Sequence, residues 1–386
     1  MALGELSAGM NLTGVRAHNE RLVMSLLQRG GAMPGAELAK RSGLSPQTVS
    51  NILRRLEAEG FLTRGAPQRG RVGKPSAPMA LDPDGALAFG LKIGRRSSDL
   101  AAIDLHGRLL ARRQLTYPYP MPDAIFGFLE EGVAGMSADL TPRQRERICG
   151  IGIGAPSEIW NWTEQLGAPP EFDVWRETRL AERVARFSDL PVFAENDATA
   201  ACRAEHAFGR GREFNDYAYV FIGSFIGGGV VMNGAVVEGG RRNAGAFGSL
   251  RTGGAGPEAP LIDTASLHLL EAAVAAAGRD PGALWAQPQD WSDFTPLLAP
   301  WIDRTAEELA RAARNMCAVI DFEAVLIDGA FPASVRAALV ERTRARLDAL
   351  DLRGLARPRI EEARIGHDAR ALGAASAPIF SQFFLR

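Results

Sequence analysis

Residues 37–62 have the sequence ELAKRSGLSPQTVSNILRRLEAEGFL, and this run constrains the fold more than any other part of the chain. Its apolar residues recur at helical spacing on both sides of Gly43, which predicts two short helices joined by a tight turn. Ser45 is a typical N-cap residue, and Pro46 fits the first turn of the second helix. The inward stripe of that helix is predicted to hold Val49, Ile52, Leu53 and Leu56.

A longer helical segment precedes this run, and a basic hairpin follows it. Apolar residues between Arg16 and Arg29 recur at helical spacing, and the Gly30–Gly31 pair predicts the end of that helix. After Gly60 the sequence FLTRGAPQRGRVGKPSAPMAL predicts a strand, a glycine-rich cationic tip and a returning strand. Three helices followed by such a hairpin resemble the MarR-like winged helix-turn-helix of many bacterial repressors.

The outer side of the helix that begins at Pro46 is polar and basic. Such side chains can contact base edges or phosphates when a helix lies in the major groove of DNA, and cations at a hairpin tip can contact phosphates or the minor groove. A small three-helix bundle with a few arginines is the alternative, but the unbroken order of helix, turn, capped helix and hairpin favours a double-stranded DNA operator as partner. The candidate DNA-binding residues are Ser45, Gln47, Thr48, Ser50, Asn51, Arg54, Arg55, Arg69, Arg71 and Lys74.

The net charge of -1 hides an asymmetry along the chain. Residues 1–78 carry eleven basic and five acidic side chains, whereas the remaining residues carry 33 basic and 40 acidic ones. A cationic first part joined to an anionic remainder predicts a polyanionic partner for the first part alone.

The sequence offers no pattern for export, for a membrane span or for a zinc knuckle. No stretch reaches the roughly 18 uninterrupted apolar residues of a spanning helix, and MALGELSAGMNLTG lacks the layout of a signal peptide. Cys149, Cys202 and Cys317 are widely spaced and form no CxxC pair, which favours buried, reduced thiols. We therefore expect a cytoplasmic protein that makes no membrane contact.

At 386 residues the chain is long enough for two or three domains. From Leu87 onward, short apolar segments with glycines, such as LAFGLKIG and ICGIGIGAP, alternate with helical segments, which predicts an α/β body. We expect a winged helix-turn-helix DNA-binding domain at residues 1–81, a first α/β lobe at 82–195, and a second α/β lobe with C-terminal helices at 196–386.

Several glycine-rich motifs follow one another along this body. They are GIGIGAP at 150–156, ENDATAA at 195–201, IGSFIGGGVVMNG at 222–234, NAGAFGS at 243–249, and IDGA and GHDARALGAA near the C-terminus. In this order they resemble the ROK family of repressors and sugar kinases. The resemblance implies an α/β fold of two actin-like, ribonuclease-H-like lobes around a cleft that binds sugar and, in the kinases, ATP.

The resemblance also assigns roles to polar residues of the cleft. Asp197 matches the family's catalytic base and Asn196 matches a sugar-binding asparagine, both at a strand-to-helix junction. A buried Asp–Asn pair suits the vicinal hydroxyls of a sugar, because an unpaired buried carboxylate is costly. Capping of a helix by either residue is the alternative. The candidate ligand-binding residues are Ser157, Asn196, Asp197, Glu205 and Asn243.

Other parts of the family's chemistry are missing. Where the kinases have an Asp-Gly-Gly-Thr type loop, residues 92–97 are KIGRRS, and Phe225 replaces a usual glycine of the second glycine-rich loop, so close approach of the backbone to phosphate is not expected. Ala246 and Ser249 stand where a sugar-binding glutamate and a sugar- and zinc-binding histidine are expected, and the following RTGGAGPEAPLID has no cysteine. We therefore expect no metal, no cofactor and no catalytic residue, with Asp197 a degenerate base position.

Together these features predict a DNA-binding transcriptional regulator, more often a repressor, of carbohydrate uptake or catabolism genes. A sugar or sugar phosphate in the cleft would set its DNA affinity, and a homodimer or dimer of dimers would supply enough base contacts. The segment Leu309–Val319 is the candidate dimer interface. Two alternatives stay open: an active ATP-dependent sugar kinase that carries a DNA-binding domain, and a DNA-binding protein whose body senses nothing.

Overall fold

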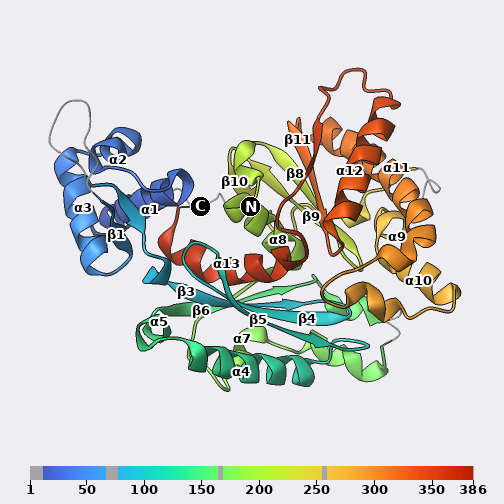
Figure 1. The fold of residues 1–386 in the computed structure, drawn as a ribbon, viewed down its shortest axis with the longest axis horizontal. Helices are drawn as coiled ribbons and strands as arrows, with labels where there is room; N and C mark the ends of the chain where they lie inside the picture. The colour runs from blue at the N-terminus through green and yellow to red at the C-terminus, as the bar shows by residue number, and fades with distance from the viewer. Residues whose placement is uncertain (1–11, 67–76, 164–167, 254–258, 386) are drawn as a thin grey trace, which may run out of the picture.

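The computed structural model describes residues 12–66, 77–163, 168–253 and 259–385 of the chain. Figure 1 shows a small helical domain formed by the N-terminal residues and two larger α/β lobes, with the last helix between the lobes. Within the described residues, no helix is both long and apolar enough to cross a membrane.

The N-terminal domain has three helices and a two-stranded hairpin, as predicted. Ser45 caps the third helix, because its Oγ accepts a hydrogen bond from the Thr48 backbone N–H at 3.1 Å. Gly43 has a φ of 71°, the left-handed conformation that glycine allows after a helix. The predicted inward stripe, Val49, Ile52, Leu53 and Leu56, is buried. The elements are α1 (Leu12–Gly30), α2 (Gly35–Ser42), α3 (Pro46–Ala58), β1 (Leu62–Arg64) and β2 (Met79–Leu81).

The first lobe is built on a five-stranded sheet with the strand order β5-β4-β3-β6-β7. The central strand β3 is buried along its whole length, which explains its apolar sequence LAFGLKI. In Figure 1, α4 covers one face of this sheet and α13 covers the other. The elements are β3 (Leu87–Ile93), β4 (Ser97–Ile103), β5 (Leu109–Thr116), β6 (Ile148–Ala155), β7 (Val192–Asn196), α4 (Pro122–Asp139), α5 (Pro142–Glu146), α7 (Leu180–Val184) and α13 (Ala369–Phe383).

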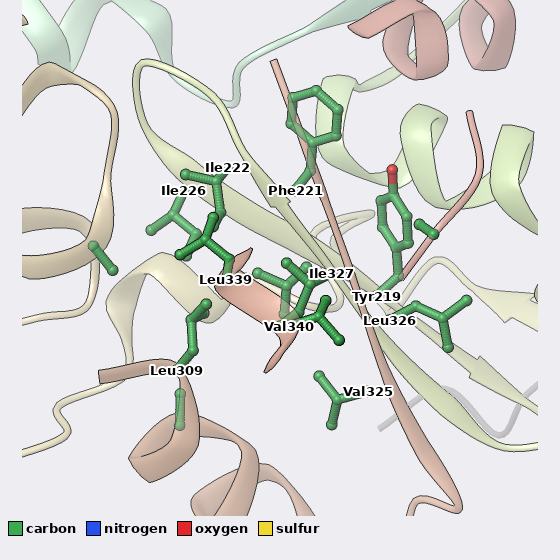
Figure 2. Close-up of a cluster of buried hydrophobic side chains, with 14 of the residues drawn as sticks. Tyr219, Phe221, Ile222, Ile226, Leu309, Val325, Leu326, Ile327, Leu339 and Val340 are labelled. Carbon is green, nitrogen blue, oxygen red and sulfur yellow. The ribbon is translucent and has the colours of Figure 1, made fainter. Parts of the chain in front are cut away.

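The second lobe is built on another five-stranded sheet, with the order β10-β9-β8-β11-β12. Its core, shown in Figure 2, joins Tyr219 and Phe221 of β8 to Ile327 of β11 and to Leu339 and Val340 of α12. The elements are α8 (Asp197–Phe208), β8 (Tyr217–Ile222), β9 (Ile226–Met232), β10 (Ala235–Val237), α9 (Ile262–Ala265), α10 (His268–Ala276), α11 (Thr295–Val319), β11 (Ala324–Gly329), α12 (Ala333–Asp348) and β12 (Arg359–Glu362).

The apolar face of α11 is used inside this lobe. Leu309, Ala313 and Met316 are buried in the same core, and Figure 2 shows Leu309 pointing toward it. The apolar side chains of this stripe therefore pack within the protomer, and a dimer interface at Leu309–Val319 stays a prediction. Val319, at the end of the helix, is 83% exposed.

The helix α13 lies between the lobes because glycines allow very close approach. A Cβ on Gly373 of α13 would lie 1.8 Å from the carbonyl oxygen of Ala200 in α8. A Cβ on Gly152 of β6 would lie 1.7 Å from the carbonyl oxygen of Ala374. These contacts explain glycines of the motifs GHDARALGAA and GIGIGAP by packing. The sequence analysis grouped residues 369–383 with the second lobe, yet they also cover the first sheet; the three-part division stays a prediction.

The N-terminal domain is docked on the body through a shared hydrophobic core. The rings of Phe61 and Phe383 lie 5.1 Å apart between centroids. The backbone N–H of Leu385 donates to Ser25 Oγ of α1 at 2.9 Å. One continuous buried cluster joins the helices of this domain to residues of β3, β4 and α13. The domain is therefore held by the end of the last helix as well as by the chain that follows β2.

Candidate functional site

The outer face of α3 holds a connected row of polar side chains. Gln47, Ser50, Asn51 and Arg54 are exposed. Asn51 Oδ1 accepts hydrogen bonds from Gln47 Nε2, at 3.3 Å, and from Arg54 Nη2. Because amide and guanidinium groups can make paired hydrogen bonds with base edges, this row has the chemistry of a recognition helix. The structure therefore brings these four predicted residues together.

The other predicted DNA-binding residues are placed differently. Ser45 and Thr48 are joined by a 2.8 Å hydrogen bond at the start of α3, where Ser45 also caps the helix. Arg55 is turned toward α1, since its guanidinium contacts Glu20 and lies 3.6 Å from Glu59. The structure thus separates Arg55 from the exposed row. Three candidates of the hairpin tip lie outside the described residues: Arg69, Arg71 and Lys74.

A cleft of about 430 Å³ lies between the two lobes. Ser157, Asn196, Asp197 and Asn243 all line it, although they come from three distant parts of the chain. Asn196 Nδ2 donates to Ser157 Oγ at 3.1 Å, and Ser157 Oγ donates to Asn243 Oδ1 at 3.4 Å. Four of the five predicted ligand-binding residues therefore form one polar wall.

Asn196 has one of the two roles that the sequence left open, the capping of a helix. Its Oδ1 accepts hydrogen bonds from the backbone N–H groups of Ala198 and Thr199, at 3.0 and 3.2 Å, and so caps α8. Its amide nitrogen is directed to Ser157 in the cleft. The capping bonds fix the orientation of the amide, so that its nitrogen faces the cleft; its role in ligand binding stays a prediction.

Asp197 is held by an arginine that the sequence analysis did not single out. Arg370 Nη1 lies 3.1 Å from Asp197 Oδ2, and both side chains are largely buried. The guanidinium of Arg370 also lies over the ring of Phe221, 4.7 Å from its centroid. The carboxylate at the base position is thus already engaged by a cation.

Glu205 does not belong to the cleft. Its side chain is fully buried at the other end of α8. Its carboxylate accepts hydrogen bonds from the backbone N–H groups of Arg210, Arg364 and Ile365, at 2.8 to 3.0 Å. Its prediction as a ligand-binding residue is therefore corrected: the carboxylate ties two chain segments together, since backbone donors satisfy it.

The two loops at the positions where the family's kinases hold phosphate contact each other in this chain. Arg95, in the turn between β3 and β4, places its guanidinium 5.1 Å from the ring centroid of Phe225, in the turn between β8 and β9. The same guanidinium lies 3.9 Å from Glu271 of α10. Both Arg95 and Phe225 line the cleft. Side chains therefore occupy the space between the two turns, where the backbone would have to approach a phosphate closely.

Lys92 replaces an expected acidic residue and forms a buried pair. Its Nζ donates to Asp99 Oδ2 at 3.1 Å and to the carbonyl oxygen and the Oγ of Ser97 at 3.0 Å. Burial lowers the pKa of Lys92 to about 8, against the opposing effect of Asp99. Lys92 is not among the residues that line the cleft.

Ala246 and Ser249 line the cleft at the positions of the missing glutamate and histidine. Among the residues that the structure describes, no group of three or more histidines, cysteines or carboxylates could hold a metal ion. Residues 254–258, within the segment where the zinc motif would follow, lie outside the described residues. The expected lack of a zinc site stays a prediction.

Two protein families match different parts of the chain, one in the N-terminal domain and one in the α/β body. Residues 16–63 match the winged helix-turn-helix DNA-binding family, and residues 88–261 match the ROK family. The chain carries a ROK family domain behind a winged helix-turn-helix. The resemblance inferred from the motifs and the expected fold class are both confirmed.

Relatives of this chain include an enzyme and a regulator. It is 28% identical to Uncharacterized protein y4fQ of Sinorhizobium fredii, over 95% of this chain and 92% of that protein. It is 28% identical to the Bifunctional enzyme NanE/NanK of Brucella melitensis, over 93% of this chain and 65% of the enzyme. It is 23% identical to the DNA-binding transcriptional dual regulator NagC of Escherichia coli, over 62% of this chain and 59% of that protein. The chain thus spans less than two thirds of the length of the last two.

Solved structures share the fold of the whole chain. A ROK family transcriptional regulator, a homolog of the Escherichia coli MLC protein, superposes with a TM-score of 0.68 at 20% identity, over 96% of this chain and 98% of its own. This likeness extends over both the winged helix-turn-helix and the ROK body.

Two contacts of cleft arginines were not predicted from the sequence. Arg370 follows the His-Asp pair of GHDARALGAA, and the motif carries no sign that its arginine returns to Asp197, 173 residues earlier. The stacking of Arg95 on Phe225 was not predicted either, because it depends on how the two lobes face each other. Arg370 is a charged residue among the small and apolar residues of ARALGAA, and this contrast is the signal that could have marked it.

Proposed function

We propose that this chain is a transcriptional regulator, a repressor in the simplest case, of carbohydrate uptake or catabolism genes, controlled by a sugar or sugar phosphate bound in the cleft. The observation that carries the proposal is the contact between Arg95 and Phe225 across the expected phosphate end of the cleft. The sugar end keeps its polar wall, while the phosphate end is filled. Such a site favours binding of a ligand without phosphoryl transfer.

The state of Asp197 supports a sensor over a kinase. A general base must accept the proton of the attacking hydroxyl, and its carboxylate has to be available to that hydroxyl. Here Arg370 neutralises the carboxylate at 3.1 Å. Phosphoryl transfer further requires positioned groups around the phosphates, which the Arg95–Phe225 pair displaces. The chain would therefore bind a sugar and release it unchanged.

The polar wall indicates the chemical class of the effector. Ser157, Asn196 and Asn243 present a hydroxyl and two amides in one hydrogen-bonded row. A hydroxyl-rich ligand can replace these internal bonds with its own donors and acceptors. Ala246 and Ser249 reduce the charge of the wall relative to the family pattern, so the effector would differ from the sugars that the glutamate and histidine recognise.

The helix α13 offers a route from the cleft to the DNA-binding domain. Its first turn carries Arg370, which contacts Asp197 in the cleft. Its last residues pack on the N-terminal domain, through Phe383 on Phe61. A ligand that competes for Asp197 would shift the position of one end of this helix and, through it, the other. The resulting change of DNA affinity cannot exceed the difference in ligand affinity between the two arrangements.

DNA binding would depend on the exposed face of α3 and on the pairing of two such helices in an oligomer. The exposed row Gln47, Ser50, Asn51 and Arg54 would enter a major groove. One such helix makes few base contacts, so we propose that a homodimer or dimer of dimers reads two half-sites.

The test is a DNA-binding titration of the full chain with duplex fragments from the region flanking its own gene, repeated with a panel of sugars and sugar phosphates. Specific binding to one fragment, altered by one sugar, is expected. Asn196→Asp keeps the capping oxygen but removes the amide donor, so it should weaken the sugar effect at least about tenfold while DNA binding without sugar stays unchanged. Asn315→Asp, outside the cleft, is the matched control. Failure of every sugar to alter DNA binding would reject the sensor.

A sugar kinase is the second candidate, because Asp197 lines the cleft at the base position. It would release ADP when mixed with ATP and the same sugar panel. We expect no turnover by the wild-type chain. Turnover that Asp197→Asn abolishes would show that the Arg370 pair opens during catalysis and would replace the sensor with an enzyme.

A further inference from the structure

A second cavity, of about 490 Å³, lies where the DNA-binding domain meets the body. Its wall includes Ser25, Gln28 and Arg29 from α1, and residues of β7, α8, β10 and the C-terminal end of α13. It shares no lining residue with the sugar cleft. An occupant of this cavity would touch the DNA-binding domain and both lobes at once.

The polar part of this wall is dominated by arginines. Arg29, Arg203, Arg212 and Arg242 line the cavity, together with two carboxylates, Glu195 and Glu238. Both carboxylates are bound by Arg203, at 2.9 and 3.2 Å. Among the ion pairs of the described residues, none joins Arg29, Arg212 or Arg242 to a carboxylate. Positive charge is thus in excess at this junction.

Arg212 is positioned by the backbone rather than by an acid. Its Nη1 donates to the carbonyl oxygen of Gln28 at 2.9 Å, and its Nη2 donates to the carbonyl oxygen of Ala207. These carbonyls lie at the C-terminal ends of α1 and α8, where a cation is favourable. Burial lowers the pKa of Arg212, and the nearby charge of Arg29 lowers it further. Two like charges therefore face one cavity, which an anion would relieve.

The remaining lining favours an organic anion over a bare ion. Phe214, Phe380 and Phe384 line the same cavity and supply apolar and aromatic surface. A volume of this size lies in the range of small-molecule sites. Arginine guanidinium groups match phosphate oxygens in pairs, and a phosphate monoester carries a charge of about -1.5 to -2 at neutral pH.

We propose that this junction cavity binds a phosphate monoester of a small metabolite, with Arg29, Arg212 and Arg242 facing the phosphate and the phenylalanines facing the carbon skeleton. Because Arg29 belongs to α1 and Arg212 and Arg242 belong to the body, the ligand joins the DNA-binding domain to the body. It therefore stabilises the docked arrangement of the two. This site is separate from the sugar cleft, because the two share no lining residue.

The experiment measures binding to the full chain by calorimetry and thermal shift, at constant low ionic strength. The probes are inorganic phosphate, glucose 6-phosphate with glucose as its partner, and AMP with adenosine. At least one monoester is expected to bind more tightly than its unphosphorylated partner and more tightly than inorganic phosphate. Arg29→Gln should weaken it about tenfold or more, because a charge-assisted hydrogen bond is lost. Arg242→Gln should weaken it as well.

Two control variants locate the binding. Arg21→Gln removes the same charge from the same helix, but Arg21 lies outside the cavity, so its affinity for the monoester should match the wild type. Asn196→Asp alters the sugar cleft and should also leave this affinity unchanged. Thermal melts of each variant without ligand show that it is folded.

Three results would overturn the proposal. One is that no probe binds the wild-type chain. Another is that Arg21→Gln weakens binding as much as Arg29→Gln, which indicates general charge attraction. The last is that Asn196→Asp abolishes monoester binding while Arg29→Gln does not, which places the monoester in the sugar cleft. If Arg29→Gln instead weakened DNA binding and bound monoester normally, Arg29 would belong to the DNA interface.

Discussion

Individual arginines decide what each surface of this molecule can do. In the cleft, Arg370 neutralises Asp197 and Arg95 stacks on Phe225, so both are engaged before any ligand arrives. On α3, Arg54 is exposed in the polar row while Arg55 is paired with glutamates. The same side chain thus serves as a structural cation or as a recognition group, according to its neighbours.

Arg54 and Arg55 give a direct test of the orientation of α3. Arg54→Ala should weaken DNA binding and reduce the slope of log affinity against log salt by about one unit, because one phosphate contact is lost. Arg55→Ala should leave the slope unchanged, since its guanidinium is engaged by Glu20 and Glu59. Titrations at several salt concentrations measure both. The reverse pattern would mean that α3 presents its other side to DNA.

His206 predicts a specific pH dependence of stability. Burial, with the nearby charge of Arg29, lowers its pKa from 6.5 to about 4. Between these values the unfolded chain binds a proton that the folded chain does not, so this contribution to stability is present above pH 6.5 and is lost as the pH falls. From pH 7 to pH 5 the loss is about 2 kcal/mol.

The measurement is urea unfolding of the wild type and of His206→Gln at pH 7 and pH 5. The fall in unfolding free energy between the two pH values should be smaller in His206→Gln by that amount. His18→Gln, at an exposed position of α1, is the control and should behave as the wild type does. An equal fall in His206→Gln would show that His206 is protonated in the folded chain.

The positions of site residues that lie in or beside a motif could be predicted from the sequence. Contacts between residues far apart in the sequence could not. Ser157, Asn196 and Asn243 lie in or beside matching motifs, and the cleft brings them together. Glu205 lies eight residues after Asp197 on the same helix, but its partners are backbone groups of residues 364–365. A linear pattern cannot show which carboxylate is satisfied by a segment that returns 159 residues later.

At the scale of elements, the strands and helices followed from local patterns. The α3 stripe, the N-cap Ser45 and the strand β3 depend on residues that are near in sequence, and the structure has them as predicted. The placement of α13 could not be predicted from local patterns, because its apolar residues suit burial against either lobe. Its small residues are what allow contact with α8 and with the first sheet together.

Gly373 tests this packing of α13. A Cβ there would lie 1.8 Å from a backbone oxygen of Ala200, so the helices would have to separate. Gly373→Ala should lower the free energy of unfolding by about 3 kcal/mol, at the upper end of overpacking effects. Gly127 of α4 has open space around the same atom, so Gly127→Ala should raise it by about 0.5–1 kcal/mol. Denaturant unfolding compares them, and equal effects would contradict the close helix contact.

For the whole molecule, a continuous hydrophobic core joins the DNA-binding domain to the body. This core provides the physical connection through which a ligand in the body can change the position of the DNA-binding helices. Val23, Leu27 and Leu56 of the N-terminal domain share one buried cluster with Ile379 and Phe384 of the C-terminus. A domain attached by a linker alone would leave such apolar residues exposed. The core therefore couples the position of α13 to that of the DNA-binding helices.

Phe384 gives the test of this coupling. Its ring is 3% exposed in the shared core and lies 4.9 Å from that of Phe380 between centroids. Phe384→Ala should cost about 3–5 kcal/mol of stability, and hydrogen exchange of α1 amides should become faster because the docking contact is weakened. Phe172→Ala removes an equally buried ring from the core of the first lobe, away from this contact. Phe172→Ala should lower stability by a similar amount and leave the hydrogen exchange of α1 amides closer to that of the wild type.

Hydrogen exchange followed by mass spectrometry measures both variants. Unchanged exchange of α1 in Phe384→Ala would mean that the DNA-binding domain is stable without the end of α13.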